Sequence, residues 1–289
     1  TERIEIDLEA QTDDLAAAAR LFGADVGGDS ATFVAAVSGT FSDLAIDLDA
    51  RAPRLAVGDT VLSDVVLDLT ATNLPDAAVI DGEARFEGPA GATRLVVATR
   101  DGGGDARTVT LTGSGPGLTL DGAATLSAGW SPERGRLDTT VSSLQPWSAF
   151  AGRALSGSAE AAVTFARRGD GWAIDGTARA DALMVGLGDG SALVTDAVTL
   201  AAAPADDGRT ALDIDAGPLR YGRLAVDAIR LDAVTDGITG DFTATLDSAT
   251  PIIPDTEAAG RFASADALVV TLDRAQPMPR PRNAVEPTI

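Results

Sequence analysis

Alternation of apolar and polar residues runs through most of this chain, and it limits what the chain can fold into. Near the start, Glu5 and Asp7 separate Ile4, Ile6 and Leu8. A period of two places the apolar side chains on one face of a strand and the polar side chains on the other. The same alternation recurs at Leu44, Ile46 and Leu48, at Val65, Leu67 and Leu69, at Leu212 and Ile214, and at Phe242 and Leu246. The pattern predicts an all-β, mainly antiparallel protein of about sixteen strands.

Turn-forming residues separate these runs at short intervals. They are Gly58-Asp59, Asp101 to Gly104, Gly169-Asp170-Gly171, Asp206-Asp207-Gly208 and Asp236-Gly237. Short turns of this composition join neighbouring antiparallel strands. We therefore expect most strands to pair with the next strand in the sequence.

The composition excludes several kinds of chemistry. The chain has 289 residues, with 43 Asp and Glu against 22 basic residues, a net charge of −21, and no His or Cys. Without His or Cys there is no thiolate nucleophile, no Ser-His triad and no usual zinc or haem site. The negative charge disfavours nucleic acid as a partner. We expect no catalytic residue, no cofactor and no metal, and no apolar stretch is long enough for a membrane-spanning helix.

Paired acids are the one pattern that suggests hydrolytic or calcium chemistry. Asp47 with Asp49, and Asp213 with Asp215, have a spacing that can bind Ca²⁺ or serve glycoside hydrolysis. Each pair alternates with apolar residues, so both carboxylates share one strand face. A solvated face that discourages aggregation is the interpretation we favour over a glycoside hydrolase.

Two segments break the alternation, and they do so in the same way. One begins at Thr12, a plausible N-cap, and stops at Gly23; the other has Pro146 in its first turn and stops at Gly152. Each predicts a short helix. An offset of 129 residues also aligns Leu15 with Leu144, Leu21 with Phe150, Val26 with Leu155, and Gly28 with Gly157.

This alignment predicts an internal repeat in which a short helix opens each run of strands. The expected organisation is the end of a preceding β module (1–11), a first module (12–141), a second module (142–250), a partial further module (251–276) and a Pro-rich tail (277–289).

Two arrangements of the strands remain open on these grounds. The apolar positions are mostly Ala, Val, Leu and Ile, and aromatic residues make up 4% of the chain. A sandwich usually fills its middle with some large aromatic side chains, so a long, curled sheet with one smooth aliphatic face fits better. The core of an ordinary sandwich remains the alternative.

A family resemblance bears on this choice. The segment from Leu144-Gln145-Pro146-Trp147 through Phe150-Ala151-Gly152-Arg153-Ala154-Leu155-Ser156-Gly157 resembles a turn found in TamB and AsmA-like envelope proteins. The earlier copy differs, with Ala24 in place of Arg153 and no proline. The motif covers about fourteen residues. The strands around it also resemble those of these envelope proteins.

The resemblance implies a β-sheet curled into a half-pipe, with an aliphatic groove that carries phospholipid acyl chains across the periplasm. It also implies an inner-membrane anchor outside this segment, a link to outer-membrane protein assembly, and an outer-membrane barrel partner for another part of the full-length chain. The expected groove lining is Ile4, Ile6, Leu8, Leu44, Ile46, Leu48, Val65, Leu67, Leu69, Leu212, Ile214, Phe242 and Leu246. The helices expected to cross the groove carry Leu15, Leu21, Leu144, Trp147 and Phe150. The alternative function is a structural or adhesive β-sandwich or solenoid with a self-buried apolar face.

Overall fold

The computed structural model describes most of the chain and divides it into two compact units. The described residues are 3–16, 26–28, 30–57, 60–74, 78–101, 106–127, 129–168, 171–188, 190–205, 208–236, 239–248, 254–264 and 268–278. The first unit is Thr1–Arg167 and the second is Arg168–Ile289. Each unit is treated below on its own.

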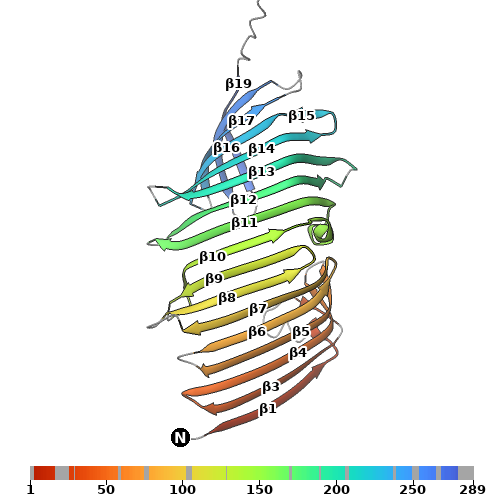
Figure 1. Ribbon diagram of the computed structural model, residues 1–289, viewed down its shortest axis with the longest axis vertical. Helices are drawn as coiled ribbons and strands as arrows, with labels where there is room; N and C mark the ends of the chain where they lie inside the picture. Colours follow the sequence, from red (N-terminus) through yellow and green to blue (C-terminus); the bar gives the residue numbers. More distant parts are fainter. Residues whose placement is uncertain are drawn as a thin grey trace, which may run out of the picture. The chain divides into compact units, whose positions relative to one another are not determined.

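The first unit is a curled antiparallel sheet (Figure 1). Its strands are β1 (Ile4–Thr12), β2 (Val26–Gly27), β3 (Ala31–Thr40), β4 (Asp43–Val57), β5 (Thr60–Leu74), β6 (Val79–Gly88), β7 (Gly91–Asp101), β8 (Arg107–Gly115), β9 (Leu118–Leu126), β10 (Pro132–Val141) and β11 (Leu155–Arg168). β1 pairs with β3, and from β3 to β11 each strand pairs with the next one in the sequence. The two-residue β2 pairs with the far end of β4.

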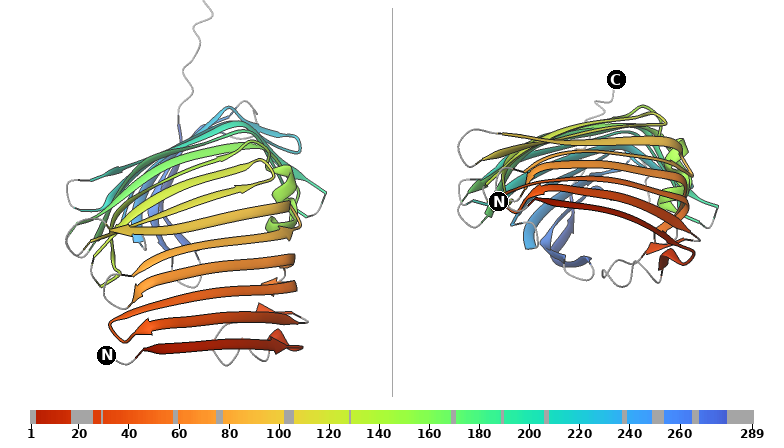
Figure 2. Two further views of the ribbon diagram at one scale, coloured as in Figure 1. Left: turned by 60° about the horizontal axis from the view of Figure 1, so that its bottom comes forward. Right: turned by 90° about the horizontal axis from the view of Figure 1, so that it is seen from below.

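The second unit repeats this plan. Its strands are β12 (Gly171–Gly186), β13 (Ala192–Pro204), β14 (Thr210–Tyr221), β15 (Leu224–Val226), β16 (Ala228–Thr235), β17 (Thr239–Asp247), β18 (Thr256–Ser264) and β19 (Leu268–Pro277). Every pairing between consecutive strands is antiparallel, and β14 pairs with both β15 and β16. Figure 2 shows how the strands bend across their length.

The predicted fold class is therefore confirmed at the level of an all-β, antiparallel, curled sheet. The described residues form nineteen strands, where about sixteen were expected. Two of them, β2 and β15, contain only two and three residues, too few to give a periodic signal. Strands end at every predicted turn: β4 stops at Val57, β7 at Asp101 and β16 at Thr235.

Only part of the first predicted helix lies within the described residues. Thr12, the expected cap, is the last residue of β1; its Oγ1 accepts the N–H of Asp14 at 3.1 Å, one residue before the helix begins at Leu15. Leu15 and Ala16 are helical, and the segment 17–23, which includes Leu21, lies outside the described residues.

The second predicted helix is present. It consists of a 3₁₀ turn, η1 (Gln145–Trp147), followed by α2 (Ser148–Ala151). Gly152 ends it in the left-handed region, with φ of 63°. The helix is fastened to β11 by Ser148 Oγ, which accepts the N–H of Leu155 at 3.0 Å.

Neither sheet is covered by a second layer of described strands. Among the described residues nine hydrophobic side chains are buried; seven are alanines, and the other two are Leu15 and Val226. No large side chain in the described part is fully enclosed. The apolar side chains therefore pack mainly beside one another within the sheet.

Candidate functional site

One face of the first sheet carries rows of apolar side chains that cross all of its long strands. Residues paired across an antiparallel ladder lie on the same face, so the register defines these rows. One row is Leu8, Ala35, Leu48, Leu69, Gly82, Val97, Leu111, Gly122, Leu137 and Val163. A neighbouring row is Ala10, Phe33, Ala50, Leu67, Ala84, Leu95, Gly113, Leu120, Thr139 and Ala161. We call the face formed by these rows the aliphatic face; neither row contains a charged residue.

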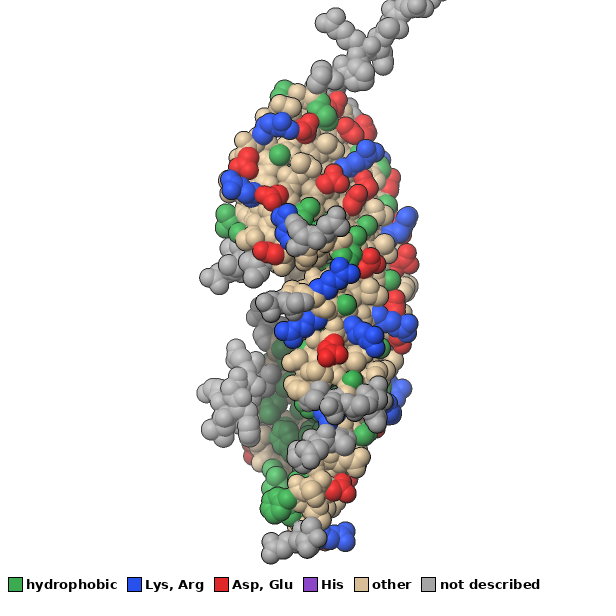
Figure 3. Space-filling view, turned by 90° about the vertical axis from the view of Figure 1, so that its left-hand side faces the viewer, with side chains coloured by type: hydrophobic (Ala, Val, Ile, Leu, Met, Phe, Trp, Pro, Cys, Tyr) green, Lys and Arg blue, Asp and Glu red, His purple; other side chains and the backbone are tan. Residues whose placement is uncertain are grey.

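The opposite face of the first sheet, which we call the polar face, carries the charges. Its strand residues include the carboxylates Glu5, Asp7, Glu9, Asp43, Asp47 and Asp49 on β1 and β4, with Arg51. On β5 to β10 they include Asp68, Asp81, Glu83, Glu87, Asp121 and Asp138, with Arg85, Arg94, Arg100, Arg134 and Arg136. Figure 3 shows hydrophobic side chains gathered in a hollow over the N-terminal strands, away from the charged side chains of the outer surface.

Several of these charges form cross-strand ion pairs. Arg94 binds Glu83 with two hydrogen bonds, of 2.6 and 2.7 Å, and Arg85 Nε lies 2.5 Å from the same carboxylate. The two guanidinium groups lower the pKa of Glu83 from its ordinary value of 4.5 to about 2, and hydrogen bonding from Arg94 is the largest cause. The same bonds raise the pKa of Arg94. These exposed pairs favour this strand register but contribute little free energy individually.

The second unit has the same division of faces. Its apolar rows include Ala202, Leu212, Ala233, Phe242 and Gly260, and Leu200, Ile214, Leu231, Ala244 and Ala258. The intervening row on the opposite face contains Ala201, Asp213, Asp232, Thr243 and Ala259. The Asp215 carboxylate lies 3.2 Å from Arg230.

The register brings together the residues that the sequence proposed as a groove lining. Nine of them, on β1, β4 and β5, share the aliphatic face of the first unit, and Leu212, Ile214, Phe242 and Leu246 share the apolar face of the second. Ile6 and Leu8, on the edge strand, are 54% and 58% exposed, and most of the others are half-buried.

The sequence interpretation missed residues on the same faces that show the same alternation. They include Phe33, Val97, Val109, Leu111, Leu120 and Val163 in the first unit, and Val198, Leu200, Ile229 and Leu231 in the second. Val109 and Leu111, for example, flank Thr110, a signal as clear as that of the segments chosen.

Leu15 lies against the aliphatic face near the start of the first unit. It is buried beside Ala31 and Ala52, and Phe33 and Val65 pack around this cluster. The connection from β1 to β3 therefore places Leu15 against the aliphatic face.

Trp147 and Phe150 lie on the same side of the sheet, at the strand ends. A Cβ added to Gly88 would lie 2.9 Å from Phe150 Cζ, and one added to Gly115 would lie 3.7 Å from Trp147 Cζ2. The two rings are 5.5 Å apart, and Trp147 Nε1 donates to the carbonyl of Pro116 at 3.2 Å. The helical turn that follows β10 therefore rests against the ends of β6 and β8.

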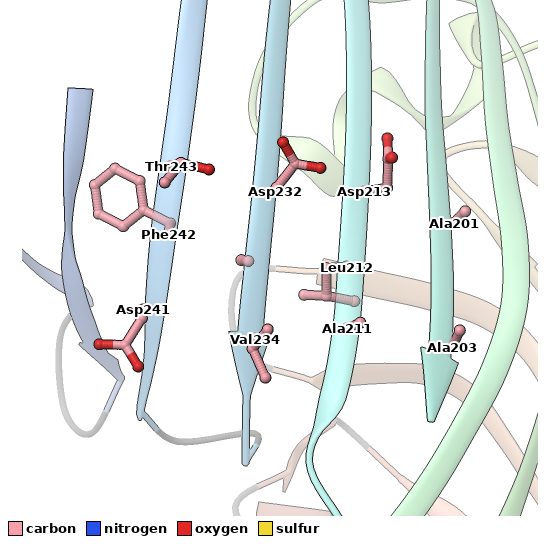
Figure 4. A pocket seen from close by; sticks show the side chains of 11 residues that line it. Ala201, Ala203, Ala211, Leu212, Asp213, Asp232, Val234, Asp241, Phe242 and Thr243 are labelled. Atoms are coloured by element: carbon pink, nitrogen blue, oxygen red, sulfur yellow. The ribbon is translucent and has the colours of Figure 1, made fainter. Parts of the chain in front are cut away.

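A hollow of about 450 Å³ in the second unit opens on the opposite, charged face (Figure 4). Its floor includes small side chains, Ala201, Ala203 and Ala211, while Asp213 and Asp232 project beside it from adjacent strands. The hollow exists because alanines leave space between longer neighbours. Leu212, Ala233 and Phe242 of the apolar rows also line it. Its carboxylates bring like charges side by side.

Within the described ranges no helix has the length and apolar character needed to cross a bilayer. No described group of three or more Asp or Glu is placed to hold a metal ion. No protein-family model, no curated protein and no solved structure matches this chain.

Proposed function

We propose that the aliphatic face of the first unit and the apolar face of the second bind phospholipid acyl chains and conduct lipid along each sheet, without catalysis. In this proposal the curl of the sheet makes the face a groove. The chain acts in the periplasm as part of a bridge between the inner and outer membranes, with a contribution to outer-membrane protein assembly. This is the role implied by the TamB and AsmA-like resemblance around Trp147.

The observation that carries the proposal is a set of apolar rows, among the described residues, that contain no charged residue and enclose no large side chain. These rows cross the first sheet from β1 to β11, yet no large side chain in the described part is fully enclosed. A self-buried sandwich, the structural alternative, would enclose such side chains in a second layer. An uncovered apolar face of this extent marks an interaction site.

The binding energy of an acyl chain on this face is compatible with its movement from strand to strand. An acyl chain of about sixteen carbons gains on the order of 10 kcal/mol when it leaves water, at about 0.8 kcal/mol per CH₂. Successive strands offer chemically similar aliphatic positions, such as Leu48, Leu69 and Val97. The binding energy then changes little from one position to the next, so that sliding meets low barriers.

Mass spectrometry of lipid that co-purifies with the protein tests the proposal through two adjacent substitutions. Leu69 lies between Leu48 and Gly82 on the aliphatic face, whereas Thr70 lies between Asp47 and Asp81 on the polar face. Leu69→Arg places a cation among apolar groups and should remove most of the bound phospholipid. Thr70→Arg gains two carboxylate neighbours and should retain it.

Circular dichroism of both variants establishes whether the sheet still forms. Equal lipid content in two folded variants, or no lipid in the unsubstituted protein, would contradict the proposal.

A further inference from the structure

Arg107 lies where the aliphatic face of the first unit ends. It is the first residue of β8 and shares a face with Val109 and Leu111, because the period of a strand is two. In the ladder it pairs with Leu126 of β9 on one side and with Asp101 of β7 on the other. The Arg107 side chain is half-buried. A guanidinium group therefore borders the apolar rows at one end of β8.

The Arg107 guanidinium lies over the ring of Trp130, in the turn between β9 and β10. Its Cζ is 4.6 Å from the ring centroid, which is a cation–π contact. The N–H of Trp130 donates to the carbonyl of Ser127 at 2.9 Å. Trp130 has φ of 62°, a conformation that bulky residues rarely adopt, and it is 40% exposed. Residues held in such conformations cluster at binding sites.

This contact orients the guanidinium without using its hydrogen-bonding edge. The indole contacts the flat side of the group, whereas the five N–H donors lie in its plane. Ion pairing through one or two of these donors leaves others for a ligand. Such an edge matches the oxygens of a phosphate group, and indole rings favour the boundary between water and apolar groups. The pair of side chains therefore suits a phosphate that is joined to apolar chains.

The length of β8 matches such a ligand. From Arg107 to Gly115 the strand extends over about 26 Å, at about 3.3 Å per residue. The acyl chains of one bilayer leaflet occupy about 15 Å, half of the hydrocarbon core. At the far end of the strand, a Cβ added to Gly115 would lie 3.7 Å from Trp147 Cζ2. A lipid along β8 could therefore place its phosphate at Arg107 and its acyl chains toward Trp147.

We propose that Arg107, oriented by Trp130, binds the phosphate of a phospholipid whose acyl chains lie along β8. The proposal rests on the lipid-binding function proposed above and gives the bound lipid a direction. Asp101 and Glu133 belong to the same ends of the neighbouring strands β7 and β10. The site therefore depends on the geometry of one guanidinium group and not on an excess of positive charge.

Two lipids with the same acyl chains, dihexanoyl phosphatidylglycerol and dihexanoylglycerol, test the proposal by isothermal titration calorimetry. The unsubstituted protein should bind the phospholipid more tightly. Arg107→Gln should lower the affinity for the phospholipid about tenfold. The same variant should bind dihexanoylglycerol as before, which also shows that its aliphatic face is intact.

Arg134→Gln is the matched control. Arg134 lies near the same strand ends but on the polar face, where its Nε donates to Thr125 Oγ1 at 3.4 Å. Its substitution removes the same charge and should leave both affinities unchanged.

The NMR signal of the Arg107 Nε–H group locates the binding, and its absence from the spectrum of Arg107→Gln identifies it. The phospholipid should shift this signal, whereas dihexanoylglycerol and inorganic phosphate at the same concentration should not. An unchanged phospholipid affinity in Arg107→Gln, an equal loss in Arg134→Gln, or an equal shift with inorganic phosphate would overturn the phosphate site alone. Failure of the unsubstituted protein to bind either lipid would overturn the proposed function, and this site with it.

Discussion

The backbone N–H of Leu144 donates to the carbonyl of Gly157 over 2.8 Å. This bond closes the connection between β10 and β11, and it joins two residues of the 129-residue alignment. Their counterparts are also neighbours: a Cβ added to Gly28 would lie 2.9 Å from Leu15 Cδ2. Both connections link strands that pair with each other, β1 with β3 and β10 with β11. The first contact is a backbone hydrogen bond, whereas the second involves the leucine side chain.

Gly157→Ala should destabilise the second of these connections. Gly157 has φ of 106°, a conformation that side chains with a Cβ rarely adopt. We expect the free energy of unfolding to fall by about 1–3 kcal/mol in urea titrations. Gly129→Ala is the control, because the nearest atom to its added Cβ is Ser127 Oγ at 3.9 Å. Equal stability of the two variants would show that the Gly157 conformation imposes no constraint.

Glu83 should make part of the stability depend on pH. The two arginines lower its folded-state pKa to about 2 from the ordinary 4.5. Its ion pairs therefore stabilise the fold fully above about pH 4.5, and this contribution is lost as the pH falls toward 2. Glu83→Gln should flatten the acid limb of the stability curve between these values. Glu160→Gln, which removes another exposed strand carboxylate, should leave the loss of stability in acid unchanged. If both variants lose stability equally in acid, Glu83 is not the group responsible.

The second unit contains two carboxylates that face each other across neighbouring strands. Removing the charge of one of them should increase stability. Asp213 lies directly opposite Asp232, and both side chains are exposed. Asp232→Asn removes the repulsion and should raise the free energy of unfolding by about 0.2–1 kcal/mol. Asp215→Asn breaks the contact with Arg230 instead and should give no such gain. Chemical denaturation of both variants at low and high salt measures the difference, which salt should reduce.

The two faces of the sheet could be predicted from the sequence, whereas the rows across it could not. The alternation Leu67-Asp68-Leu69 assigns each side chain to a face, because the period of a strand is two. That Leu69 lies between Leu48 and Gly82 depends on the register. Turns and bulges set that register, and the shifts between Leu44 and Ile46 and between Ser63 and Val66 have no periodic signal.

The helical turn at Trp147 could likewise be predicted only in part from the sequence. Gln145-Pro146-Trp147 and Gly152 predicted where it begins and ends, from local preferences of proline and glycine. Its partner Pro116 is 31 residues away and has no sequence signal. The hollow beside Asp213 was missed for a related reason, since it depends on alanines from neighbouring strands. Long-range contacts of this kind require the folded register.

Photo-crosslinking on β14 tests most directly the central claim that the apolar face holds lipid. Ile214 lies on that face between Leu200 and Leu231, while Asp213 and Asp215 are exposed on the other. A photo-reactive residue at position 214 should capture phospholipid in cells, and the same residue at 213 or 215 should not. Capture at 213 or 215 without capture at 214, or no capture at any position in folded protein, would contradict the account.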